Sequence, residues 1–208
     1  MAKNQITRRL IRRSRAAAML AGCALLGVTG GTTTFGAFNG QASNATNSVQ
    51  AGSVSISDND GGVAMMGFSN ALPGTSDTSC ITVTYNGSLS SNVRLYGTTG
   101  GTGLAQYMNL TVTRGTFSAT PPAYDSCTNF VADATNYTGA GSGVIYNGTL
   151  ENFADNYAAG LTDPTAAAQE TWTNGESHVY KFQVSVQENV AAEGKTATQS
   201  FTWEARNL

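Results

Sequence analysis

Two alternating stretches near the C-terminus decide the fold: Tyr180-Lys-Phe-Gln-Val-Ser-Val186 and Thr198-Gln-Ser-Phe-Thr-Trp-Glu-Ala205. In the first, every second side chain is apolar and the side chains between them are polar. The second repeats the pattern, with Phe201, Trp203 and Ala205 opposite Thr202 and Glu204. Successive side chains of a strand point to opposite faces, so each stretch has one apolar face. This is typical of antiparallel sheets packed face to face.

The same alternation continues upstream in shorter stretches. It is found at residues 50–57, 81–85, 93–95 and 108–112, with Val54 and Ile56 sharing one face of the first stretch. Turn signals lie between these stretches, at Asn86-Gly87, Asn174-Gly175 and Glu193-Gly194-Lys195, and Gly97 to Gly103 is expected to be a loop. We therefore predict an all-β fold, an antiparallel β-sandwich of jelly-roll type.

Helix is expected only as short insertions in the sandwich. Phe153, Tyr157 and Leu161 have helical spacing, and Asp163-Pro164 provides an N-cap and a first-turn proline for a segment ending at Glu170. About 170 residues follow the N-terminal leader described next, which suits a single domain over 38–208.

The first residues resemble a secretory signal peptide. An apolar run, Ala16 to Val28, follows a basic head and precedes small and polar residues; the head contains Lys3, Arg8, Arg9, Arg12, Arg13 and Arg15. The run is short and rich in glycine and alanine, so we expect no stable membrane span in the mature protein. We predict a signal peptide over 1–37, cleaved after Ala37 or alternatively near Ala42, and a secreted, extracellular or cell-surface protein. Lipidation of Cys23, within Leu20-Ala21-Gly22-Cys23, is the alternative processing route, and a retained membrane anchor is the alternative to cleavage.

Removing the leader makes the chain acidic. Five cations remain against thirteen acids, a net charge of about −8; the cations are Arg94, Arg114, Lys181, Lys195 and Arg206. No basic patch is present to release phosphate counterions, so nucleic acid is not an expected partner.

Two cysteines follow the leader, Cys80 and Cys127. An even pair in an exported chain favours a structural disulfide. The alternative is that the two cysteines are unrelated buried thiols. Their spacing matches neither a CxxC redox pair nor a zinc ribbon.

The residues mark no catalytic or metal site. The chain has one histidine, His178, beside Glu176 at the start of a predicted strand, where we expect a solvated surface side chain. No HExxH helix and no cluster at ligand spacing is found, so no metal, cofactor or enzymatic activity is expected. Asp58-Asn59-Asp60-Gly61 resembles part of a calcium loop but lacks its register, and a turn is the expected structure.

Several motifs, in order, resemble the TasA/camelysin-like family. Residues 38–56, Phe38-Asn-Gly-Gln-Ala-Ser-Asn-Ala-Thr-Asn-Ser-Val-Gln-Ala-Gly-Ser-Val-Ser-Ile56, are similar to the mature start of such proteins, with an aromatic after the cleavage point. Leu72-Pro-Gly-Thr75 followed by the strand from Ile81 is similar to a second module, although Thr75 and Ser76 stand before Asp77 where an acid normally follows Pro-Gly directly. Trp172 to Ser177 and Phe201 to Arg206 look like the tail of actinobacterial members. The resemblance covers nearly the whole mature chain.

This resemblance implies a secreted jelly-roll subunit of extracellular biofilm-matrix fibres. A dedicated signal peptidase would process it, and its partners would be further copies of itself and other matrix components. In such fibres the N-terminal strand of one subunit completes a sheet of the next. The candidate donor here is 38–57, with Phe38, Val49, Val54 and Ile56 as its polymerisation residues. The alternative is an ordinary first strand paired within its own domain.

Two other functions stay open at this point. A surface adhesin or carbohydrate-binding module would use the loops of the same sandwich. Camelysin-type members have been assigned metallo-endopeptidase activity, which the single histidine disfavours.

Overall fold

The computed structural model describes residues 39–41, 52–67, 71–164 and 169–208. Ala37, Phe38, Ala42 and Val49, together with the signal peptide, lie outside these residues. The described residues belong to one compact unit.

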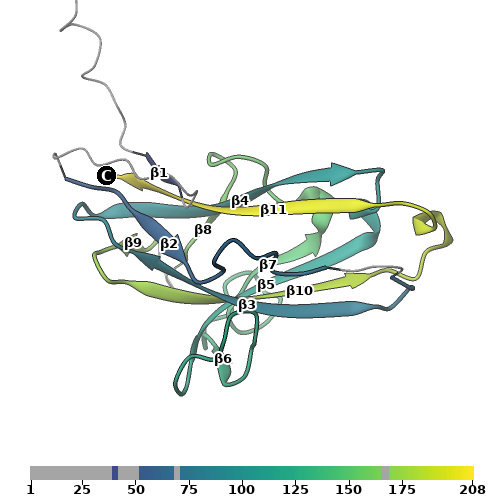
Figure 1. The fold of residues 1–208 in the computed structure, drawn as a ribbon, viewed down its shortest axis with the longest axis horizontal. Coiled ribbons are helices and arrows are strands. Elements are labelled where there is room, and N and C mark those ends of the chain that lie inside the picture. Colours follow the sequence, from purple (N-terminus) through teal and green to yellow (C-terminus); the bar gives the residue numbers. More distant parts are fainter. Residues whose placement is uncertain (1–38, 42–51, 68–70, 165–168) are drawn as a thin grey trace, which may run out of the picture. The chain divides into compact units, whose positions relative to one another are not determined.

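Two antiparallel sheets form two layers, with β11 and β4 in one and β10 and β3 in the other (Figure 1). The first sheet has the order β1-β11-β4-β8, and β9 also pairs with β4; its strands are β1 (Asn39–Gln41), β11 (Ala197–Asn207), β4 (Ser91–Gly101), β8 (Leu161–Thr162) and β9 (Thr171–Trp172). The second sheet has the order β2-β3-β10-β5-β6, and β7 also pairs with β5. Its strands are β2 (Ile56–Asp58), β3 (Ser76–Tyr85), β10 (Ser177–Val186), β5 (Met108–Phe117), β6 (Phe130–Ala132) and β7 (Val144–Thr149). The all-β prediction is confirmed, and the jelly-roll type stays a prediction.

The core lies between the layers, where the alternation of the sequence placed it. Phe182 of β10 is fully buried, and its ring lies 4.5 Å from that of Phe201 and 6.0 Å from that of Trp203 in β11, centroid to centroid. Tyr180, also in β10, packs against Trp203 of β11, with 5.5 Å between the ring centroids. Burying an aromatic side chain of this size contributes about 1.5–3 kcal/mol. These inter-sheet contacts therefore hold the two layers together.

The predicted turns at Asn86-Gly87 and Glu193–Lys195 carry the chain between the two sheets. β3 and β4 belong to different sheets, as do β10 and β11. The 3-10 turn η3 (Val190–Ala192) lies just before the second turn, and Asn189 caps it by accepting a hydrogen bond from the Ala191 amide.

Two local predictions were wrong. Gly97 to Gly101 is not a loop, because β4 continues through it and pairs with β11 up to Ala197. At Gly97 a Cβ would collide with the carbonyl oxygen of Ser200, so this glycine permits the close approach of the two strands.

The expected helices are also absent from the described residues of 150–170, which contain only the 3-10 turn η2 (Leu150–Asn152) before β8. The residues with helical spacing instead make tertiary contacts. Phe153 lies edge-on to Tyr146 and Phe201, and the Tyr157 ring lies under the guanidinium of Arg206 at 3.8 Å. A third 3-10 turn, η1 (Ala105–Tyr107), precedes β5.

A disulfide joins Cys80 of β3 to Cys127, which confirms the predicted pairing. Cys127 belongs to the long connection between β5 and β6, and the Cys80 amide also donates to the Asp125 carbonyl in that connection. The bridge therefore fastens this connection to the outer edge of β3.

Replacing both cysteines with alanine should lower the free energy of unfolding by about 4 kcal/mol, because the bridge restrains 47 residues of the unfolded chain. Urea unfolding followed by tryptophan fluorescence measures the difference. A loss below about 1 kcal/mol would contradict the assigned role.

Candidate functional site

A positive charge lies on the apolar inner face of the second sheet. Arg114 follows Leu110 and Val112 on the same face of β5, and it lies directly opposite Tyr180 of β10. Only 8% of the residue is exposed. A buried cation is costly unless carboxylates and hydrogen bonds surround it, so its neighbours define a site.

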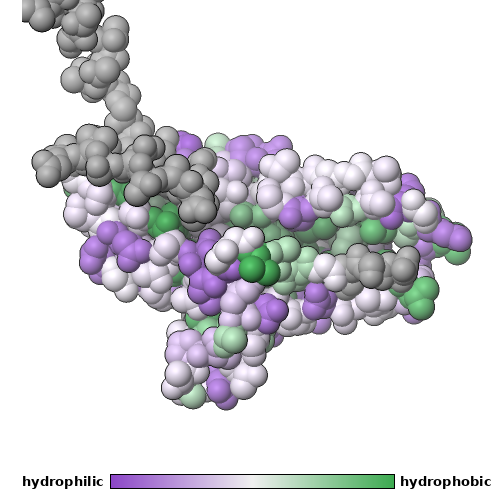
Figure 2. Space-filling model, viewed as in Figure 1, coloured by the Kyte–Doolittle hydropathy of each residue, from purple (hydrophilic) through white to green (hydrophobic). Residues whose placement is uncertain are grey.

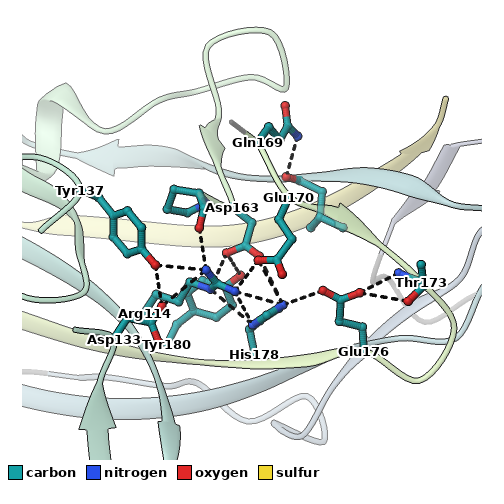
Figure 3. Close-up of polar contacts among 12 residues, drawn as sticks. Arg114, Asp133, Tyr137, Asp163, Gln169, Glu170, Thr173, Glu176, His178 and Tyr180 are labelled. Carbon is teal, nitrogen blue, oxygen red and sulfur yellow. Dashed lines mark hydrogen bonds and ion pairs between the residues drawn. The ribbon is translucent and has the colours of Figure 1, made fainter. Parts of the chain in front are cut away.

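Three carboxylates meet this guanidinium, two from the segment between β8 and β9 and one from the residues after β6 (Figure 3). Arg114 Nε lies 3.0 Å from Asp163 Oδ1, just after β8, and Nη2 lies 2.5 Å from Glu170 Oε2, just before β9. Nη1 lies 3.4 Å from Asp133 Oδ2, after β6, and also donates to the Pro164 carbonyl. The guanidinium thereby connects β5 of the second sheet to the β8–β9 segment of the first.

His178 lies beside this group on β10 (Figure 3). Its Nε2 is 3.1 Å from Glu176 Oε1 and 3.4 Å from Asp163 Oδ2. The Trp172 ring packs on it at 4.5 Å, and 12% of the side chain is exposed. The prediction of a solvated surface histidine was wrong, because the alternation that buries Tyr180 and Phe182 also turns His178 inward.

Asp163 is the most deeply buried carboxylate of the cluster, with 2% of its side chain exposed. Burial raises its pKa to about 6, although His178 and Arg114 act in the opposite direction. The Tyr180 hydroxyl donates to Oδ1 at 3.1 Å, whereas Oδ2 has no hydrogen-bond partner. Burial also opposes the charge of Arg114, but the negative charges of Asp163, Glu170 and Asp133 outweigh it and raise the arginine's pKa.

Asp163, Glu170 and His178 each offer a ligand atom, and these atoms lie within 4.8 Å of one another. They are the one such group of three among the described residues. The sequence shows no cluster at ligand spacing, and strand pairing is what brings these three residues together; the expectation of no bound metal stays a prediction. The sequence contained a signal of the site: Arg114 continues the apolar face that starts at Met108, Leu110 and Val112, and His178 continues that of Tyr180 and Phe182.

A second candidate site is the outer edge of β11. β4 pairs with β11 along its whole length, whereas β1 pairs only with Glu204 to Arg206. No described residue pairs with the outer edge of β11 from Ala197 to Trp203.

The main-chain groups on this edge can be assigned from the ladder. The Gly97 amide donates to the Ala154 carbonyl, away from β11, so Gly97 and Phe201 form a non-hydrogen-bonded pair. The N–H and C=O groups of Phe201, and by alternation those of Gln199 and Trp203, therefore point outward. None of these groups has a main-chain partner among the residues that the structure describes.

The corresponding edge of β3 is capped. β2 pairs with β3 only from Val83 to Tyr85. Beyond it the Thr78 amide donates to Asp77 Oδ1, that of Cys80 to the Asp125 carbonyl and that of Thr82 to Asn59 Oδ1. Capped amides cannot bind an added strand.

The structure places some of the predicted donor residues. Ile56 is buried in β2 and pairs with Tyr85 of its own chain, and Val54 packs against the core. Phe38 and Val49 lie outside the described residues. Residues 58–62 form the expected turn, in which the Asp60 amide donates to Asp58 Oδ1 and the Gly62 amide to Asp60 Oδ1.

No protein-family model and no curated protein matches this chain. Within the described part of the chain, no helix has the length and apolar character needed to cross a membrane.

The raised pKa of Asp163 predicts a pH dependence of stability. The pKa of Asp163 is about 6 in the folded chain and 3.8 in the unfolded chain. Between pH 7 and pH 5 the folded chain therefore takes up a proton that the unfolded chain does not, and the free energy of unfolding rises as the pH falls. Asp163→Asn should remove about 1 kcal/mol of that gain. Urea unfolding of both chains at pH 7 and pH 5, in chelator, measures it, and identical pH dependences would contradict the assignment.

Proposed function

We propose that this chain is a secreted structural protein, the subunit of extracellular biofilm-matrix fibres that assemble by N-terminal strand exchange. The edge of β11 from Ala197 to Trp203, with which no described residue pairs, is the single observation that carries the proposal. The donor would come from the predicted segment 38–57 of a neighbouring copy, and within it from the residues before Gly52, because Val54 and Ile56 pack in their own chain. The protein would act without catalysis, and its main partner would be itself.

The register of β1 supports the fit of such a donor. Gly40 pairs with Ala205 and Gln41 with Glu204, in antiparallel orientation. A donor strand in the same register would oppose Ala42 to Trp203 and Ser48 to Ala197, so 42–48 spans the open edge. Strand addition derives affinity from main-chain hydrogen bonds, each worth about 1 kcal/mol.

Head-to-tail strand donation is a heterologous contact, which extends into an open filament unless the rotation between copies closes a ring. The donor segment and the acceptor edge are different surfaces, so each added copy presents a fresh edge. Cleavage after Ala37 would free the donor at its N-terminus. The disulfide and the net charge of about −8 suit an oxidising, extracellular setting.

Electron microscopy of two chains tests donation directly. The chain beginning at Phe38 should form filaments, whereas a chain beginning at Gly52 should stay monomeric. Gly52 is the chosen start because it removes the donor but keeps Ile56, which is buried against the core. Filaments from both chains, or from neither at high concentration and acidic pH, would contradict strand donation.

A variant of the acceptor edge provides the matched control. Gln199→Pro removes an outward amide and should abolish filaments, because proline cannot donate to an added strand. Both Gln199→Pro and Gln199→Ala remove the hydrogen bond between the Thr99 hydroxyl and the Gln199 side chain. Gln199→Ala keeps the main-chain N–H, however, and should still polymerise.

A further inference from the structure

We infer that Asp163, Glu170 and His178, with Glu176 beside them, form a binding site for a divalent transition-metal ion of the zinc class. The ion would be structural, and the inference does not rest on strand exchange. Imidazole nitrogen and carboxylate oxygen are the ligand types that such ions accept.

The first observation is the free oxygen of Asp163. Oδ1 is held by Arg114 Nε at 3.0 Å and by the Tyr180 hydroxyl at 3.1 Å. Oδ2 is buried, has no hydrogen-bond partner, and lies 3.4 Å from His178 Nε2. A buried carboxylate oxygen without a partner is costly, and a bound cation would satisfy it.

The second observation is the orientation of Glu176. Its Oε2 accepts hydrogen bonds from the amide and hydroxyl of Thr173, at 2.8 and 3.2 Å. Its Oε1 is thereby directed at His178 Nε2, 3.1 Å away. Outer hydrogen bonds of this kind orient the ligands of metal sites.

Charge gives the third argument. One guanidinium, that of Arg114, faces Asp133, Asp163 and Glu170, and Glu176 lies on the other side of the imidazole. Four carboxylates against one arginine leave an excess of negative charge in a half-buried site. A divalent ion would bring the cluster close to neutrality.

Arg114 does not occupy the ligand position of His178. Its Nη2 lies 2.9 Å from Nδ1 and 3.4 Å from Nε2 of the ring. An atom this close to both nitrogens lies over the ring face. Arg114 Nε also donates to Nδ1 at 3.3 Å, so Nε2 carries the ring hydrogen and directs it at the carboxylates, where a bound metal ion would take the place of that hydrogen.

Such an ion would pin three points of the chain together. Asp163 and Glu170 flank the ends of β8 and β9 in the first sheet, and His178 belongs to β10 in the second. The ion would therefore reinforce the junction of the two sheets that Arg114 already makes.

Isothermal titration of the full chain tests the site, with Cys23→Ser so that no free thiol competes. After chelator treatment, the chain should bind one Zn²⁺, and bind Mg²⁺ and Ca²⁺ far more weakly. Asp163→Asn should weaken Zn²⁺ binding at least about a hundredfold. The exposed control Asp155→Asn should bind as the parent does. Absence of Zn²⁺ binding, or undiminished binding by Asp163→Asn, would overturn the inference.

A second readout needs no variant of the cluster. His178 is the sole histidine of the chain, so its ring nitrogens give one pair of ¹⁵N resonances. Zn²⁺ should shift Nε2 as a ligand resonance at one equivalent. An unchanged Nε2 resonance would overturn the site even if Asp163→Asn failed to fold.

Discussion

The ion pair between Arg114 and Asp163 is the constraint around which one side of the sandwich is organised. Arg114 occupies an inner-face position on β5, and its charge has to be matched within the protein. Asp163 and Glu170 match it from the β8–β9 segment of the other sheet. Breaking a buried pair by removing one partner typically costs 3–5 kcal/mol, more than most single contacts in a domain. The pair joins the two sheets beside Tyr180, whose hydroxyl donates to Asp163 and whose ring packs against Trp203.

The outer edges of β3 and β11 differ in how their main-chain groups are paired. Side-chain and main-chain acceptors cap the outward amides of β3. Among the described residues nothing pairs with β11 from Ala197 to Trp203. Natural sheets usually protect their edges, so an edge with which no described residue pairs supports the proposed assembly through added strands. The proposed fibre function and the proposed metal site concern different surfaces, and each can be tested without the other.

The sandwich was predictable from sequence because its two longest apolar faces follow strict alternation. Phe182 and Trp203 fell on the inner faces that the pattern assigned them. The helical spacing of residues 153–161 gave a wrong prediction, because Phe153 packs on Tyr146 and Phe201, and these contacts depend on the tertiary structure. The charged cluster was missed for the same reason. Its residues come from β5, the β8–β9 segment and β10, and only strand pairing brings them together. The alternation did contain a sign of it, since both Arg114 and His178 continue apolar faces.

A double-mutant cycle between Arg114 and Asp163 tests the organising role of their pair most directly. The variants Arg114→Met, Asp163→Leu and their combination would be compared by urea unfolding at pH 7 in chelator. Each single variant should lose about 3–5 kcal/mol, because it leaves one charge buried without its partner. The combined variant should lose clearly less than the two losses added together, a coupling of about 2 kcal/mol or more. Strictly additive losses would show that the two side chains stabilise the fold independently, and would contradict this account.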